Sequence, residues 1–111
     1  MKTLDRKALL AIKVELPSET VDVPEWGVSV ILRGLTGKEQ SALYRSASKK
    51  GGGVDEETFA ARLVSVCLFD KDGNRLLEDG EYEAVLSWPG PVFNRLVQAS
   101  MRLNGLADSG N

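Results

Sequence analysis

The sequence contains no histidine and one cysteine, Cys67. Without histidine, Ser-His-Asp triads, Cys-His dyads and histidine-ligated zinc sites are all excluded. One cysteine cannot form a disulfide within the chain, which is typical of proteins from a reducing compartment such as the cytoplasm. Cys67 lies in the apolar stretch LVSVCLF, which predicts a small buried side chain and not an exposed thiolate. We therefore expect no enzyme activity and no cofactor.

Long hydrophobic runs and a strong net charge are also missing. The apolar runs are far shorter than the roughly 20 residues that a membrane span needs, and MKTLDRKALLAIKVEL lacks the pattern of a secretion signal. The formal net charge is −2, so bulk electrostatics indicates no nucleic-acid partner. The 111 residues suit one domain. We expect this domain over 1–106 and a disordered tail over 107–111, with no membrane and no nucleic acid as partners.

The residues that are present predict an α+β fold that begins with a small antiparallel β-meander. The apolar side chains of residues 12–16 alternate with charged ones, and this period of two predicts a half-buried strand. Residues 21–23 and 28–33 are further strand candidates, so we expect two or three strands within 12–33. Trp26 lies at the bend between the last two, where we expect it to anchor the core.

Three to four helices are expected after the meander. Thr36 and Glu39 have the spacing of a capping box, in which each side chain accepts a hydrogen bond from the other residue's backbone. The glycines 51–53 lack the lysine of a phosphate-binding loop and predict a flexible linker. The expected helices span about 37–49, 55–68, 82–86 and 91–104, and a short one precedes the meander at 3–10. The helix over 55–68 is apolar on two sides and should be central to the core.

The stretch DKDGNRLLEDGE, residues 70–81, has the acidic spacing of a calcium-binding EF-hand loop. The residues in register are Asp70, Asp72, Asn74, Glu78 and Glu81. The sixth loop position must be glycine because the chain turns sharply there, but it is Arg75, and SWPGP soon breaks the following helix. A short hairpin near residues 68–77 explains the stretch better, so we assign no metal ligands. A weak calcium-binding adaptor is the alternative.

Four segments then occur in order: VPEWG, RGLTGKEQ, ARLVSVCLFDKDGNRLL and RLNGL. Together they resemble the tail assembly chaperones of long-tailed phages and prophages, from about residue 4 to 106. The resemblance implies a non-enzymatic assembly factor in the host bacterial cytoplasm. Such a factor binds the tape measure protein, keeps it soluble, helps to recruit the major tail tube protein and does not remain in the virion. A frameshifted longer form of the chain and further copies of it are the other implied partners. A neck or connector component is the rival function.

The candidate partner-binding surface is the last predicted helix and the turn before it. Its period places Val92, Leu96, Ala99 and Leu103 toward the core. The other residues that we assign to partner binding are Trp88, Phe93, Val97, Met101, Arg95 and Arg102. Helix-in-groove binding would suit a long amphipathic client. The alternative for the apolar members of this set is ordinary core packing, and for the two arginines a solvated rim.

Overall fold

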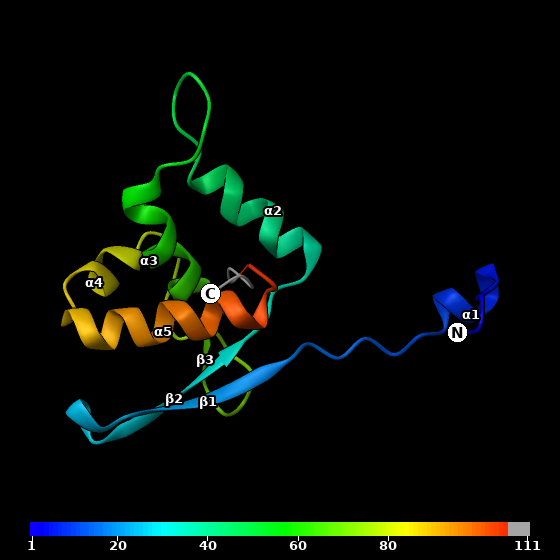
Figure 1. Ribbon diagram of the computed structural model, residues 1–111, viewed down its shortest axis with the longest axis horizontal. Helices are drawn as coiled ribbons and strands as arrows, with labels where there is room; N and C mark the ends of the chain where they lie inside the picture. Colours follow the sequence, from blue (N-terminus) through cyan, green and yellow to red (C-terminus); the bar gives the residue numbers. More distant parts are fainter. Residues whose placement is uncertain (107–111) are drawn as a thin grey trace.

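A small antiparallel sheet lies at the base of the molecule (Figure 1). The computed structural model describes residues 1–106. In it β1 (Ser18–Val23) pairs with β2 (Val28–Arg33), and β3 (Leu68–Phe69) pairs with the other side of β2. The turn between β1 and β2 is a 3-10 helix, η1 (Pro24–Trp26), closed by Gly27 at a φ of 66°. Side chains alternate between the two faces of a sheet, and one face is buried while the other is more exposed.

Five helices are present in the described chain, so the predicted α+β fold is confirmed. Their bounds are α1 (Arg6–Leu10), α2 (Gly37–Ser46), α3 (Glu56–Cys67), α4 (Tyr82–Leu86) and α5 (Gly90–Leu103). Each predicted helix is found, with shifts of up to three residues at its ends. Within residues 1–106 no helix has both the length and the apolar character that a bilayer crossing requires.

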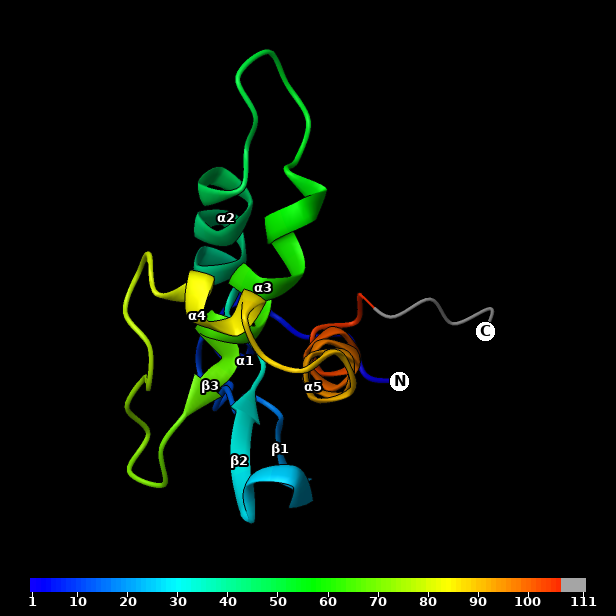
Figure 2. The ribbon, with the colours of Figure 1, turned by 90° about the vertical axis from the view of Figure 1, so that its left-hand side faces the viewer.

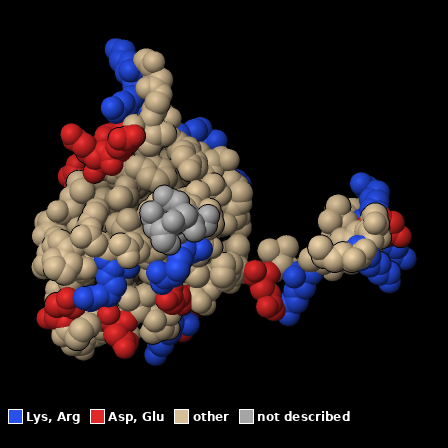
Figure 3. All heavy atoms as spheres, in the orientation of Figure 1, with Lys and Arg blue, Asp and Glu red and all other residues tan. Residues whose placement is uncertain are grey.

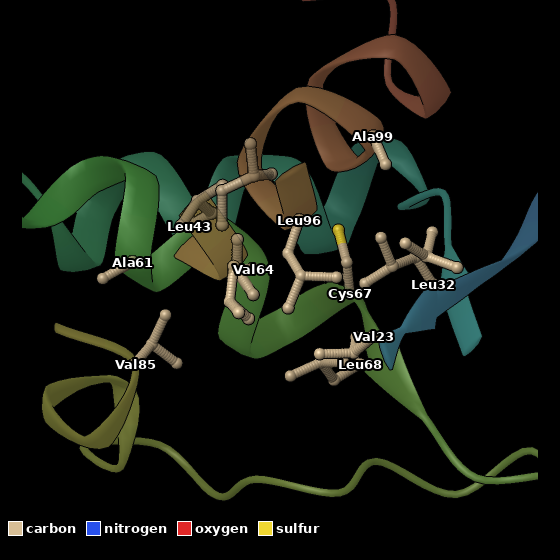
Figure 4. Close-up of a cluster of buried hydrophobic side chains, with 13 residues drawn as sticks. Val23, Leu32, Leu43, Ala61, Val64, Cys67, Leu68, Val85, Leu96 and Ala99 are labelled. Atoms are coloured by element: carbon tan, nitrogen blue, oxygen red, sulfur yellow. The ribbon is translucent and has the colours of Figure 1, made fainter. Parts of the chain in front are cut away.

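The hydrophobic core lies between the sheet, α3 and α5, with α4 closing one end (Figure 4). Leu32 and Val23 of the sheet face Leu96 of α5 and Val64 of α3, and none of the four is exposed to solvent. Cys67 is buried among them, as predicted. Burial raises the pKa of its thiol, which keeps it protonated and unreactive.

The capping box at the start of α2 is confirmed. Thr36 Oγ1 accepts a hydrogen bond from Glu39 N at 3.1 Å, and Glu39 Oε1 accepts one from Thr36 N at 2.9 Å. The helix ends at Ser46 and not near residue 49, because residues 48–54 form a narrow loop closed by a bridge between its ends. The glycines 51–53 all have positive φ in this loop, which projects at the top of Figure 1.

Two predictions about the N-terminal third are wrong. Residues 12–16 form no strand, because no described strand lies beside them, and Ile12 and Val14 are 49% and 76% exposed. A period of two gives a strand only where a neighbour accepts its hydrogen bonds. Trp26 is no core anchor: it is 41% exposed and packs edge-on against Trp88, with ring centroids 5.1 Å apart. The predicted disordered tail, 107–111, lies outside the described residues.

Candidate partner-binding surface

Helix α5 carries most of the candidate residues, and its sequence explains which face is buried. Val92, Leu96 and Ala99 recur at helical spacing and are 0–2% exposed, as predicted. Phe93, Val97 and Met101 line the adjoining flank of α5, where they are half-buried and pack against the core. This flank therefore contributes to the core and presents part of its apolar surface to solvent.

Met101 contributes to a shallow hollow between α5, α3 and α2, which we call the α3–α5 hollow. It has a volume of about 340 Å³ and is lined by Tyr44, Val54, Glu56, Phe59, Ala60 and Met101. The rings of Tyr44 and Phe59 pack at a centroid distance of 5.3 Å. Its lining is mostly apolar and comes from three helices and the end of the 48–54 loop, so no local sequence pattern indicates that these residues meet.

The arginines Arg95 and Arg102 lie on the opposite flank of α5 and form ion pairs with the β1–β2 hairpin. Arg95 binds both carboxylate oxygens of Glu25 at 2.8 Å, and Arg102 binds both of Glu19 at 3.0 Å. The hydrogen bonds from Arg95 lower the pKa of Glu25 from 4.5 to about 2. Both arginines thus fasten α5 to the sheet, and their position separates them from Phe93 and its apolar neighbours.

Trp88, in the turn between α4 and α5, is half-buried against the core and against Trp26. The T-shaped pair joins this turn to η1, next to the ion pair between Arg95 and Glu25. Leu86 and Val28, from α4 and β2, are 45% and 48% exposed. The structure thus brings Trp88 near the arginine flank of α5 and away from the α3–α5 hollow.

A second hollow, between α2, α3 and the segment before α4, was not foreseen from the sequence. This α2–α3 hollow has a volume of about 290 Å³. Its apolar residues are Leu35, Ala42, Leu43, Val66 and Tyr82, and its charged residues are Glu39, Arg62, Arg75 and Asp79. Figure 2 shows α2 and α3 side by side, with residues 70–81 passing along one flank. Only the tertiary structure brings these three segments together.

The acidic stretch 70–81 begins with the predicted hairpin, in which Phe69 bridges to Arg75. Asp70 Oδ1 accepts hydrogen bonds from the backbone N–H groups of Asn74 and Asp72 at 2.9 and 2.8 Å, and these bonds lower the pKa of Asp70. Arg75 pairs with Asp79 at 3.1 Å. Across residues 1–106 no three histidine, cysteine, aspartate or glutamate side chains gather in a way that could hold a metal ion.

The comparisons with known proteins agree with the resemblance seen in the sequence. The family model described as phage tail assembly chaperone matches residues 5–110. No curated protein matches the chain. Among solved structures, the bacteriophage HK97 tail assembly chaperone is 28% identical and superposes with a TM-score of 0.61, covering 92% of this chain and 95% of that one. Because the family model matches nearly the whole chain and the fold is similar to that of a solved member, this protein belongs to the phage tail assembly chaperone family.

Proposed function

We propose that this protein is a non-enzymatic chaperone that binds the tape measure protein in the host bacterial cytoplasm. It keeps that protein soluble and helps to recruit tail tube subunits during tail assembly. The observation that supports the proposal most is the family match over residues 5–110, together with an open apolar hollow on the folded domain. The clients themselves are inferred from the resemblance.

The client-binding surface that we propose is the α3–α5 hollow with the adjoining flank of α5. An amphipathic helix from the client would place apolar side chains against Met101, Phe59 and Tyr44, which are partly exposed. Met101 adds a flexible side chain that adapts to differing client residues. Arg95 and Arg102 are held in ion pairs on the opposite flank of α5, so we leave them outside this surface.

The test uses charge placed in the hollow without removing buried core atoms. Ala60→Glu introduces a carboxylate there, and glutamate is compatible with the helix α3. We expect it to abolish the gain in soluble tape measure protein that co-expression with the wild-type chain produces. The measurement is the soluble fraction of the tape measure protein from the same phage or prophage.

Leu86→Glu is the matched control, because Leu86 is an exposed apolar residue of another helix, away from the hollow. It should leave client solubility unchanged. Circular dichroism must show that both variants remain folded. A folded Ala60→Glu variant that still keeps the client soluble would contradict the proposed surface, and a wild-type chain that never solubilises the client would contradict the function.

A further inference from the structure

The 48–54 loop joins α2 to α3 and projects from the body of the protein as a formed turn (Figure 1). A bridge holds its two end residues together. Between them Lys49 N donates a hydrogen bond to Gly53 O at 2.9 Å, and Lys49 O accepts one from Gly52 N at 3.1 Å. Gly51 has a φ of 94°, the positive value that the third residue of a type II turn requires. These contacts give the tip of the loop a defined direction.

The tip of the loop carries backbone donors that the fold does not use. Within residues 1–106, the N–H groups of Lys50, Gly51 and Gly53 donate to no acceptor. A Cβ atom added at any of the glycines 51–53 would meet no atom within 4 Å, so another molecule can approach this backbone closely. Neighbouring N–H groups in a turn favour anions. The tip is therefore suited to an anionic acceptor from outside the domain.

Positive charge without a partner surrounds these donors. Lys49 and Lys50 are exposed, and like Arg45 in the last turn of α2 they form no ion pair within residues 1–106. The four ion pairs of this part of the chain all use other arginines. Figure 3 shows blue side chains on the projecting loop at the top of the molecule. The loop is thus a cationic surface that the fold leaves unneutralised.

The base of the loop belongs to the proposed client-binding surface. Val54, at the end of the loop, lines the α3–α5 hollow together with Tyr44, the residue before Arg45. At about 340 Å³ the hollow is near the lower end of the sizes of small-molecule sites, so it holds only a short part of a helix. A client helix that continues past Val54 lies beside the loop and its lysines.

The charge pattern around the loop favours carboxylates over a nucleic-acid backbone. Three acidic residues, 55–57, form the start of α3 directly after the loop. Two lysines and a few N–H groups match one or two carboxylates, whereas a duplex carries a phosphate about every 1.7 Å along its axis. Such a dense row of negative charge would also meet the three acidic residues.

We propose that the 48–54 loop binds an acidic segment of the client, next to the apolar segment that lies in the α3–α5 hollow. This inference rests on the proposed function and adds the chemistry that the chaperone recognises. Carboxylates of the client accept hydrogen bonds from Lys49, Lys50 and the unused N–H groups of the tip. Because the hollow is apolar and the loop is cationic, only one orientation of a client helix satisfies both.

NMR titration of the chain with a hexaglutamate peptide tests the loop by itself. We expect saturable shifts of the amide signals of Gly51 and Gly53, and no such shifts with a hexalysine peptide. Lys49→Gln with Lys50→Gln should weaken hexaglutamate binding at least about threefold, a modest factor because each exposed ion pair contributes little.

The matched control is Lys7→Gln with Lys13→Gln. It removes the same charge from two exposed lysines outside the loop, and neither of them forms an ion pair within residues 1–106. This variant should bind hexaglutamate as the wild type does.

The complex with the client provides the second measurement. The chain is co-expressed with the tape measure protein of the same phage or prophage, and the soluble complex is isolated. Hydrogen exchange of the loop amides should be slower in this complex than in the free chain, because carboxylates occupy the N–H groups. Lys49→Gln with Lys50→Gln should lower the soluble fraction of the client, whereas Lys7→Gln with Lys13→Gln should not.

Three results would overturn the proposal. The first is the absence of saturable hexaglutamate shifts in the loop, and the second is loop amides that exchange equally fast in the free chain and in the client complex. The third is tighter binding of a DNA duplex than of hexaglutamate at the same salt concentration. The proposed function fails separately: a wild-type chain that binds hexaglutamate but never solubilises the client would contradict that function and, with it, the partner named here.

Discussion

At the scale of single residues, a few polar side chains hold together segments that are far apart in the sequence. Arg95 and Arg102 each hold a carboxylate of the β1–β2 hairpin from the same flank of α5. Asn104, just after α5, accepts a hydrogen bond from Leu35 N at 2.7 Å and so ties the end of α5 to the start of the α2 segment. These contacts fix α5 across the sheet, which sets the direction of its apolar flank.

The ion pair between Arg95 and Glu25 predicts a specific pH dependence. The pKa of Glu25 is about 2 in the folded protein, below its ordinary value of 4.5, so the pair stabilises the fold fully above about pH 4.5. That contribution is lost as the pH falls toward 2, when Glu25 becomes protonated. In Arg95→Gln we expect the pKa of Glu25 to rise toward 4.5, measured by NMR titration of its carboxyl carbon.

The control for this titration is Arg102→Gln, which removes the other ion pair of the same helix and should leave the pKa of Glu25 where it is. If the wild-type Glu25 titrated near 4.5, the pair would not persist in solution.

Gly34 should tolerate no side chain. Alanine there would place Cβ 3.0 Å from Pro17 Cγ and 3.3 Å from Leu103 O. We expect Gly34→Ala to lower the free energy of unfolding by about 1–3 kcal/mol, the usual cost of overpacking, as measured by urea denaturation. Gly37→Ala is the matched control, because nothing lies within 4 Å of its added Cβ and alanine favours the first turn of α2. A Gly34→Ala variant as stable as wild type would contradict the close packing of Gly34 against Pro17 and Leu103.

At the scale of elements, local sequence signals placed the helices well. The capping box set the start of α2, and acidic residues in the first turn set the start of α3, where Asp55 Oδ1 accepts a hydrogen bond from Glu57 N. These signals act within one turn of the chain, so the sequence alone reveals them. The sequence predicted the ends of helices less accurately. Helix α2 ends early because the 48–54 loop is closed by a bridge between Ser48 and Val54, which the local pattern does not encode.

The hairpin near residues 68–77 leads to a prediction about calcium. Asp70, the first ligand of an EF-hand alignment, already accepts two backbone hydrogen bonds, and Arg75 occupies the position that requires glycine. We expect isothermal titration calorimetry to detect no saturable calcium binding below about 1 mM. A micromolar dissociation constant that disappears in Asp70→Asn would revive the calcium-binding alternative.

At the scale of the whole molecule, a three-stranded sheet supports α3 and α5, α2 packs beside α3, and the 48–54 loop and residues 1–16 project outward. The two hollows lie at different positions along α3, one with Phe59 and Ala60 and the other with Ser65 and Val66 in its lining. The client-binding surface that we propose, on the α3–α5 hollow, is therefore separate from the α2–α3 hollow.

The proposed chaperone role predicts the fate of the protein after assembly. A chaperone that leaves once the tail is built should be abundant in lysates and absent from purified particles, whereas a neck or connector component stays in the virion. Quantitative mass spectrometry of both fractions decides between them, with the major tail tube protein as the positive control. Stoichiometric recovery of this chain from particles would favour the structural role.

Part of the candidate site could be predicted from the sequence. The period of α5 identified Val92, Leu96 and Ala99 as its buried face. The helical period could not show that Arg95 and Arg102 bind the β1–β2 hairpin, because their carboxylate partners lie about 70 residues or more away along the chain. It also could not show that Phe93 and Met101 are only half-buried, because that depends on how closely α3 approaches α5.

The sequence by itself determined the helices, the turns, the family and the absence of histidine chemistry, because each depends on residue types within a short stretch. The tertiary structure alone decided where apolar residues found partners. Leu68 and Phe69, which the sequence placed in a short hairpin, also pair with β2 as the third strand, whereas Ile12 and Val14, which have an alternating strand pattern, are unpaired and exposed. A strand needs an edge to pair with, and a hollow needs helices brought side by side, so neither can be read from one segment alone.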